Sequence, residues 1–356
     1  MDRQGTNRRL AVVLFNLGGP DSLKAVRPFL FNLFGDPAII RVPQPLRWII
    51  AKLISRKRMP EAVKIYQALG GYSPLLQETR KQADALENLL ALECEARVFI
   101  AMRYWFPLAQ ETAREVAAFD PDQIVLLPLY PQYSTTTSGS SFKDWERASR
   151  AAEITNPTHA VCCYPTAPGL VEAHLRRILE KIENREHKKL PRLLFSAHGL
   201  PENIIRAGDP YAWQVEATVA ATVRALKDHL KIARLDHTIC YQSRVGPMEW
   251  LKPSIEQEIS RAGDQGRTLL VVPISFVSEH SETLYELDIK YAKLAAEKGV
   301  PFYDRVEALR CDEGFIETLA GLVRAAVSGP ALACDQGDRC CPAGYKGCPT
   351  AAEKTQ

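Results

Sequence analysis

The fold can be deduced from the stretch Leu193-Leu194-Phe195-Ser196-Ala197-His198-Gly199-Leu200-Pro201. This apolar run follows Pro191 and ends on a histidine, a glycine and a proline, which is typical of a short buried strand. In open α/β sheets, ligands bind outside the carboxyl ends of the strands. His198 is therefore either a site residue at that edge or a structural histidine in a loop, and this stretch alone does not decide between them.

Predicted strands and helices alternate along the chain. Strands are expected at residues 10–15, 96–102, 123–129, 193–196, 236–241, 268–274 and 301–304, with a strand or linker at 158–164. Helical spacing occurs at residues 22–34, 45–58, 77–90, 108–119, 142–152, 170–183, 213–230, 254–262, 282–298 and 314–327. This alternation predicts an α/β fold with parallel sheets of βαβ units, in two halves of roughly 150 residues each.

Size and charge limit the class of protein. A chain of 356 residues suits one large or two medium domains, and a net charge of +3 is too small to indicate a nucleic-acid partner. No apolar run approaches the roughly 18 residues needed to cross a bilayer. The apolar residues 10–15 are too few for a signal peptide and lack a small-residue cleavage site. We therefore expect a cytosolic chain, or a mature chain without its transit peptide.

Residues 45–58 predict an amphipathic helix with a basic end. Its apolar residues are interleaved with Arg47 and Lys52, and it ends in Arg56-Lys57-Arg58. One interpretation is a core-facing helix whose cations are solvated. The other is an apolar lip that contacts a membrane surface or an apolar ligand, with cations suited to anionic headgroups.

A second segment with a candidate site histidine, here accompanied by glutamates, follows the predicted strand at 268–274. It contains His280 and Glu282, which we expect at the same sheet edge as His198. Glu282, Glu286 and Lys290 lie at i, i+4 and i+8, on one face of an α-helix. This face is either a ladder that carries cations in or protons out, or a solvated surface with an ordinary Glu–Lys pair.

The nine cysteines argue against a disulfide framework in a cytosolic chain. Cys162 and Cys163 are adjacent, and four more occur in the Gly- and Pro-rich tail at Cys334, Cys340, Cys341 and Cys348. The tail spacing, Cys-x5-Cys-Cys-x6-Cys, differs from the paired Cys-x2-Cys of zinc ribbons. The tail is either a segment without structure or a metal or redox site.

Several ordered blocks resemble the ferrochelatases over about residues 10–328. The blocks are residues 193–201 with 206–211, 241–248 with Trp250, 276–288, 16–20, 70–74, 103–104 and 130–141. The resemblance implies a chelatase fold of two Rossmann-like, doubly wound domains with parallel sheets and a porphyrin cleft between them. It implies an N-terminal domain at 1–160 with a porphyrin lip at 45–75, a C-terminal domain at 161–304 with the catalytic histidine, a closing helix at 305–330 and a Cys-rich tail at 331–356.

The resemblance implies a lyase that inserts Fe2+ into protoporphyrin IX to give protohaem, with release of two protons, at the terminal step of haem biosynthesis. The apolar lip favours protoporphyrin over coproporphyrin III as the substrate. The same residues are also compatible with a cobalt or nickel chelatase, a non-catalytic porphyrin carrier and an iron–sulfur sensor. The expected location is cytoplasmic, with peripheral contact to the inner membrane, and a homodimer is one expected assembly.

The resemblance also implies residue roles. His198 resembles the essential histidine, with Glu282 facing it across the macrocycle and His280 beside it, and ferrous iron meets His198 and Glu282. The expected substrate-binding residues are Tyr66, Ser73, Arg103, Tyr104, Tyr130, Tyr211, Trp250 and Phe276. The chemistry agrees, because a neutral imidazole accepts pyrrole protons near neutral pH and carboxylates bind a hard cation. Rigid aromatics can bind the porphyrin bent, at a strain of roughly 1–5 kcal/mol.

Some members of the family bind a 2Fe–2S cluster, which needs four thiolates. The resemblance implies Cys334, Cys341 and Cys348 with Cys162 or Cys163, Cys340 as a replacement for Cys341, or the four tail cysteines alone. Two departures limit the comparison. Thr135 stands where animal members have a cluster-ligating cysteine, and Lys290 stands where many relatives have an acid or amide, which puts an outer metal site on that helix in doubt.

Overall fold

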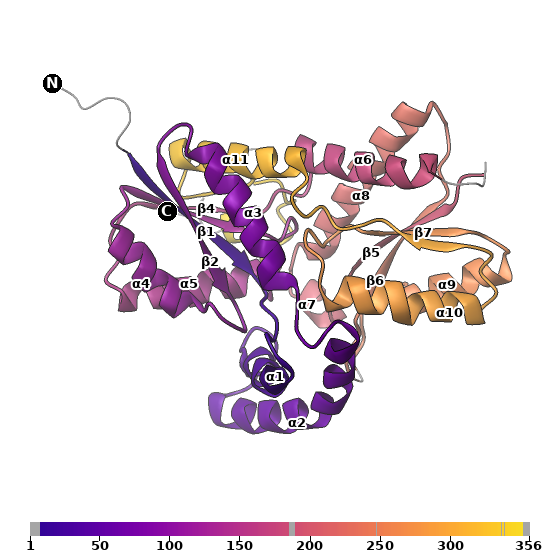
Figure 1. The fold of residues 1–356 in the computed structure, drawn as a ribbon, viewed down its shortest axis with the longest axis horizontal. Coiled ribbons are helices and arrows are strands. Elements are labelled where there is room, and N and C mark those ends of the chain that lie inside the picture. Colours follow the sequence, from indigo (N-terminus) through magenta and orange to yellow (C-terminus); the bar gives the residue numbers. More distant parts are fainter. Residues whose placement is uncertain (1–7, 185–188, 247, 336, 338, 352–356) are drawn as a thin grey trace. The chain divides into compact units, whose positions relative to one another are not determined.

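The computed structural model describes residues 8–184, 189–246, 248–335, 337 and 339–351 (Figure 1). The described residues form two compact units. Unit 1 comprises those within Met1–Tyr164, Ile316–Cys340 and Pro349–Gln356, and unit 2 comprises those within Pro165–Phe315 and Cys341–Cys348. Among the described helices, none is both long enough and apolar enough to cross a membrane.

Unit 1 contains a five-stranded parallel sheet in the order β2-β1-β3-β4-β9. Its strands are β1 (Arg9–Asn16), β2 (Glu95–Met102), β3 (Gln123–Pro128), β4 (Thr158–Val161) and β9 (Leu332–Ala333). Strand β1 is buried along nearly its whole length, as expected for a parallel strand covered on both faces. The interpretation of the tail as a segment without structure is wrong for β9, because it pairs with β4.

Two of the main helices of unit 1, α2 and α5, are longer than the segments predicted for them. They are α1 (Val26–Gly35), α2 (Gln44–Ala68), α3 (Leu75–Leu90), α4 (Ala109–Phe119), α5 (Ser138–Ala151) and most of α11 (Glu313–Ser328), with short 3-10 turns η1 (Leu23–Ala25) and η3 (Pro349–Ala351). Helix α2 continues through Pro60 to Ala68 and packs on α1 around Phe29 and Ala51 (Figure 1). Helix α5 begins inside the loop predicted at residues 134–141.

Unit 2 contains a four-stranded parallel sheet in the order β6-β5-β7-β8. Its strands are β5 (Arg192–His198), β6 (His237–Gln242), β7 (Leu269–Pro273) and β8 (Tyr303–Arg305). Successive side chains of β5 enter different cores: Phe195 packs with Val215, and Leu194 packs with Ile255. Because β5 is central and covered on both faces, His198 lies at the carboxyl edge of a fixed strand.

The helices of unit 2 are α6 (Pro168–Glu183), α7 (Glu202–Arg206), α8 (Tyr211–Leu230), α9 (Ile255–Asp264), the π-helix η2 (Ser281–Tyr291) and α10 (Ala292–Glu297). The prediction of a single α-helix at 282–298 is wrong. Its first part is a π-helix, whose turns close between i and i+5, so the i, i+4, i+8 spacing no longer defines one straight face. The α/β class and the parallel sheets are confirmed.

Candidate active site

Two parallel strands bring His198 and Glu282 together. His198 ends β5, and Glu282 lies in the first turn of η2, which follows the neighbouring strand β7. His198 Nδ1 and Glu282 Oε2 are 2.8 Å apart, and their side chains are 38% and 19% exposed. The two segments expected at one sheet edge therefore meet there, and both side chains remain accessible to a ligand.

Each member of this pair stabilises the charged form of the other. Burial alone would lower the pKa of His198, but the charge and the hydrogen bond of Glu282, together with the charge of Glu286, outweigh it and raise that pKa above its ordinary value. Burial alone would raise the pKa of Glu282, but His198 and His280 lower it to about 2. The contact thus favours an imidazolium paired with a carboxylate, and it makes His198 a stronger base than His280.

His280 differs from His198 in its proton affinity. Its Nδ1 lies 3.2 Å from the carbonyl oxygen of Ser278, and that oxygen can only accept a hydrogen bond. Its Nε2 lies 3.9 Å from Glu282 Oε2. Burial lowers the pKa of His280 below its ordinary value. The site thus combines two imidazoles of different proton affinity.

Glu286 is linked to this pair through two residues that the sequence did not single out. Its Oε2 accepts hydrogen bonds from Ser243 Oγ at 2.6 Å and Gln242 Nε2 at 3.1 Å. Gln242 Nε2 also donates to the carbonyl oxygen of Glu282. Burial, followed by the charge of Glu282, raises the pKa of Glu286, so this carboxylate holds a proton more readily than Glu282. Gln242 ends β6 and Ser243 follows it, and this position at the same sheet edge could have indicated them.

Three of the predicted aromatic residues belong to unit 2. The rings of Phe276 and His280 lie with centroids 4.8 Å apart. Trp250 forms an isolated bridge with Pro201, and a Cβ atom on Gly199 would lie 3.4 Å from its ring. Tyr211 is buried and donates to Ser275 Oγ at 3.3 Å. Phe276 therefore lies beside His280, and Trp250 lies beside the segment that follows His198.

The predicted residues of unit 1 include a buried charge network. Arg103 pairs with Asp36 at 2.9 Å and Asp144 at 3.5 Å, and its Nε donates to Ser140 Oγ at 2.7 Å. Tyr104 is 1% exposed and donates to Asp36 at 2.8 Å. The sequence did not predict Asp36 or Asp144, which lie far from Arg103 along the chain. The guanidinium is neutralised within unit 1, so its contact with a propionate stays a prediction.

The other predicted residues of unit 1 lie in separate surroundings. Ser73 is buried, and its backbone N–H donates to the Pro20 carbonyl oxygen at 2.8 Å. Tyr66 packs in the apolar cluster between α1 and α2. Tyr130 follows β3 and is half-buried. Their roles in substrate binding stay predictions.

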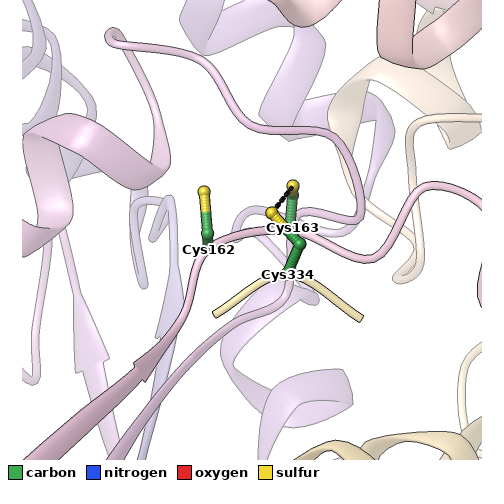
Figure 2. A group of neighbouring side chains, drawn as sticks. All are labelled: Cys162, Cys163 and Cys334. Carbon is green, nitrogen blue, oxygen red and sulfur yellow. Dashed lines mark hydrogen bonds between the residues drawn. The ribbon is translucent and has the colours of Figure 1, made fainter. Parts of the chain in front are cut away.

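Four cysteines gather in unit 1. The sulfurs of Cys162, Cys163 and Cys334 lie within 4.8 Å of one another, and all three residues are buried (Figure 2). Cys163 Sγ is 3.7 Å from Cys334 Sγ and 3.6 Å from Cys340 Sγ. The parallel pairing of β4 with β9 explains the group, because both strands lead directly into it. Both members of the Cys162–Cys163 pair therefore belong to it.

These four sulfurs fit a metal centre. Thiolates bound at about 2.3 Å to one tetrahedral metal lie about 3.8 Å from each other. Hydrogen bonds with the thiols of Cys162 and Cys163 lower the pKa of Cys334, while those with Cys162 and Cys334 raise the pKa of Cys163, so Cys334 is the cysteine of this pair that more readily becomes the thiolate a metal requires. In unit 2, by contrast, Cys341 Sγ accepts a hydrogen bond from Gln214 Nε2 at 3.0 Å, and Cys348 is buried.

Comparison with known proteins decides the family. Residues 9–327 match the family model described as Ferrochelatase. A ferrochelatase from Phenylobacterium zucineum is 55% identical over 343 residues, which cover 96% of this chain and 97% of the relative. The chain belongs to the ferrochelatase family. A ferrochelatase from Rickettsia bellii is 49% identical over 347 residues, or 96% of this chain and 95% of the relative.

The ferrochelatase fold is shared with a more distant chelatase. The crystal structure of the sirohydrochlorin chelatase SirB from Bacillus subtilis, in complex with cobalt, aligns with a TM-score of 0.53 and 11% identity. The alignment covers 91% of this chain and 97% of SirB. At this identity the likeness establishes the fold alone, and it confirms the predicted chelatase fold.

Proposed function

We propose that this ferrochelatase inserts Fe2+ into protoporphyrin IX, giving protohaem and two protons at the terminal step of haem biosynthesis. The 2.8 Å contact between His198 and Glu282 carries the proposal. Insertion needs a group that accepts pyrrole protons and an oxygen or nitrogen ligand for a divalent cation. An imidazole and a carboxylate at an accessible sheet edge supply both.

His198 accepts the pyrrole protons. Its raised pKa makes it a stronger base, but it can act only after losing the proton that Glu282 stabilises. The approach of a dication lowers the pKa of a nearby imidazolium by repulsion, so His198 gives up its proton and is then free to accept one from a pyrrole nitrogen. Glu286, whose pKa is raised, is suited to take the released proton onward.

The porphyrin substrate needs apolar surface beside this polar edge. Phe276 and Trp250 supply rigid rings near the segments of His280 and His198. Remote apolar contacts can offset the strain of a bent macrocycle, whose nitrogen lone pairs then become accessible to the metal. Protoporphyrin is less polar than coproporphyrin III and is the preferred substrate in this proposal.

A spectroscopic insertion assay with both porphyrins tests the proposal. The unmodified protein should form protohaem, and His198→Ala should lower kcat by at least about a hundredfold, the contribution typical of a general base. Protoporphyrin fluorescence quenching should give a similar Kd for both proteins. His237→Ala, which changes an exposed histidine of the same sheet, is the control. Retained turnover in His198→Ala would overturn the assigned role, and binding without turnover in the unmodified protein would favour a carrier.

We also propose that Cys162, Cys163, Cys334 and Cys340 hold a 2Fe–2S cluster. The support is the group of buried sulfurs in unit 1 and the lowered pKa of Cys334. The set differs from the one that the sequence resemblance favoured, because it takes both Cys162 and Cys163 and leaves out Cys341 and Cys348. When bound, such a cluster supplies one-electron redox chemistry and crosslinks β4 to the tail.

The exposed face of α2 supports peripheral contact of a cytoplasmic protein with the inner membrane. Leu46, Trp48, Ile49 and Leu53 are between 49% and 63% exposed. Lys52 and the basic residues 56–58 lie on the same helix, and Lys52 Nζ is 4.8 Å from the centre of the Trp48 ring. Tryptophan beside lysine suits the headgroup region of an anionic bilayer.

A further inference from the structure

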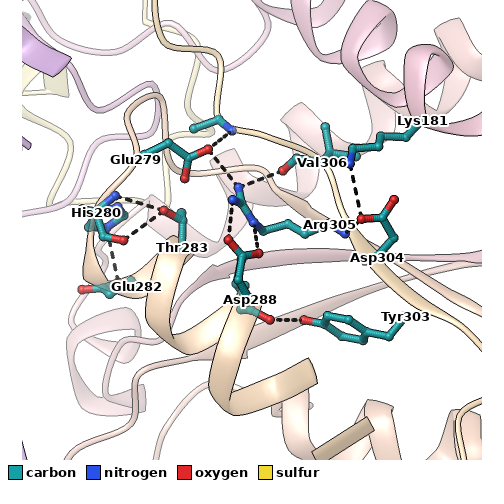
Figure 3. A network of polar contacts seen from close by, with 12 residues as sticks. Lys181, Glu279, His280, Glu282, Thr283, Asp288, Tyr303, Asp304, Arg305 and Val306 are labelled. Carbon is teal, nitrogen blue, oxygen red and sulfur yellow. Dashed lines mark hydrogen bonds and ion pairs between the residues drawn. The ribbon is translucent and has the colours of Figure 1, made fainter. Parts of the chain in front are cut away.

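Arg305 joins two acidic residues on either side of the candidate catalytic segment. It ends β8, is 8% exposed, and uses every nitrogen of its guanidinium (Figure 3). Its Nη1 donates to Glu279 Oε1 at 2.9 Å, while Nε and Nη2 form a two-pronged contact with Asp288, at 2.5 and 2.8 Å. Two parallel N–H bonds to one carboxylate fix orientation as well as distance.

The two partners bracket the residues that face His198. Glu279 directly precedes His280, and Asp288 lies in η2, six residues after Glu282. Glu279 Oε1 also accepts from the backbone N–H of Ala308 at 2.8 Å, so the loop is held to the chain after β8 at a second point. Figure 3 shows Arg305 between these carboxylates, with His280 and Glu282 on the segment that connects them.

A π-helix needs such support from its surroundings. Runs of π-helix are rare and occur mostly as single turns at functional sites, whereas η2 has 11 residues. If η2 relaxed to α-helical turns, each turn would close one residue earlier. Glu282 would then rotate about the helix axis relative to Asp288, and its carboxylate would leave the position opposite His198.

We propose that Arg305 is a positioning residue for metal insertion: by clamping Glu279 and Asp288, it holds the segment that carries His280 and Glu282 in register with His198. This inference rests on the proposed function, because it matters only if these residues perform the insertion. Lysine in place of Arg305 keeps the charge but loses the planar fork, so it separates orientation from charge.

The electrostatics agree with the clamp. Burial alone would raise the pKa of Glu279, but the charge of Arg305 and the hydrogen bonds of Glu279 keep it below its ordinary value. Glu279 is therefore a buried carboxylate whose charge depends on Arg305. Loss of the guanidinium leaves that charge without its main partner, which would push the loop toward solvent.

The test compares Arg305→Lys and Asp288→Asn with the unmodified protein. Each should lower kcat for iron insertion by roughly tenfold to a hundredfold, the cost of a misplacement of about 1 Å, while the Kd for protoporphyrin changes less than about twofold. Lys181→Gln breaks the neighbouring, partly exposed pair between Lys181 and Asp304 and should leave kcat unchanged. A fall in melting temperature with unchanged kcat would overturn the proposal in favour of a purely structural role.

A double-mutant comparison shows whether Arg305 acts through Glu282. Glu282→Asp keeps the acid but shortens its side chain, so the carboxylate is already displaced in that variant. Arg305→Lys should then reduce the remaining kcat by clearly less than it does in the unmodified protein. Multiplicative losses would contradict the proposal. If the unmodified protein inserts no iron, the proposed function fails. If it does insert iron and Arg305→Lys and Asp288→Asn keep its kcat, the positioning role alone fails.

Discussion

His198 and Glu282 are 84 residues apart in sequence, yet His198 Nδ1 and Glu282 Oε2 lie 2.8 Å apart. The contact forms because β5 and β7 are parallel neighbours, so the segments that follow them leave the sheet at the same edge. An acid and an imidazole in this geometry stabilise each other's charged forms. The pair therefore sets the proton affinity of the candidate base.

Glu282→Gln should shift the titration of His198 to lower pH. Burial lowers the pKa of His198, whereas the charge and the hydrogen bond of Glu282, with the charge of Glu286, raise it and together outweigh burial. Without the charge of Glu282, burial lowers the pKa of His198 with less opposition from neighbouring groups. The imidazole therefore loses its proton at a lower pH. An NMR titration of the His198 ring measures this shift. Glu249→Gln, which changes an exposed partner of Arg206, should leave the titration unchanged, and a raised pKa in Glu282→Gln would contradict this electrostatic coupling.

His174 should make the protein less stable in mild acid. It lies on α6 and is 2% exposed, and burial lowers its pKa to about 4. Below an unfolded pKa of about 6.5, the unfolded chain binds a proton that the folded chain does not. Stability is therefore lost as the pH falls from about 6.5 to 4, by up to about 3 kcal/mol.

His174→Leu should remove most of this acid loss. Urea unfolding at pH 7 and pH 4.5 measures the free energy of unfolding, and the difference between the two values should shrink in the variant. His237→Leu changes an exposed histidine and should preserve the slope with pH. An unchanged slope in His174→Leu would show that other groups cause the acid loss.

Cys163→Ser should abolish the proposed cluster, because Cys163 Sγ lies 3.7 Å from Cys334 Sγ and 3.6 Å from Cys340 Sγ. Protein purified without oxygen should be reddish, with about two iron and two sulfide ions per chain. The variant should lose both, while Cys94→Ser, which changes a cysteine outside the group, should retain them. One zinc or iron ion without sulfide would instead indicate a single tetrahedral metal, and colourless, metal-free protein would refute the site.

Trp48→Glu with Leu53→Glu should weaken binding to anionic vesicles by at least about tenfold, since each exposed apolar side chain contributes on the order of 1 kcal/mol or more when buried. Co-sedimentation with phosphatidylglycerol vesicles measures the loss. Leu92→Glu is the matched control, because Leu92 is 83% exposed but lies outside α2. Equal binding of the double variant and the control would show that α2 does not contact the bilayer.

Much of the fold follows from local pattern. The apolar run that ends on His198 forms β5, and the alternation of strands with helices forms two parallel sheets. Local pattern was less informative where the same periodicity is compatible with two kinds of helix. The segment after Glu282 has ordinary helical periodicity but forms a π-helix, and its contact with Arg305 through Asp288 joins residues that are not neighbours in sequence.

The sequence by itself determined the fold class and the family blocks, and it singled out His198, His280 and Glu282 as candidates, because periodicity and strand ends are local properties. Only the tertiary structure decided which distant groups meet. Asp36 neutralises Arg103, Ser243 and Gln242 hold Glu286, and Cys162 joins Cys163 and Cys334. Such partners depend on the order and register of parallel strands, which bring together residues that no sequence spacing relates.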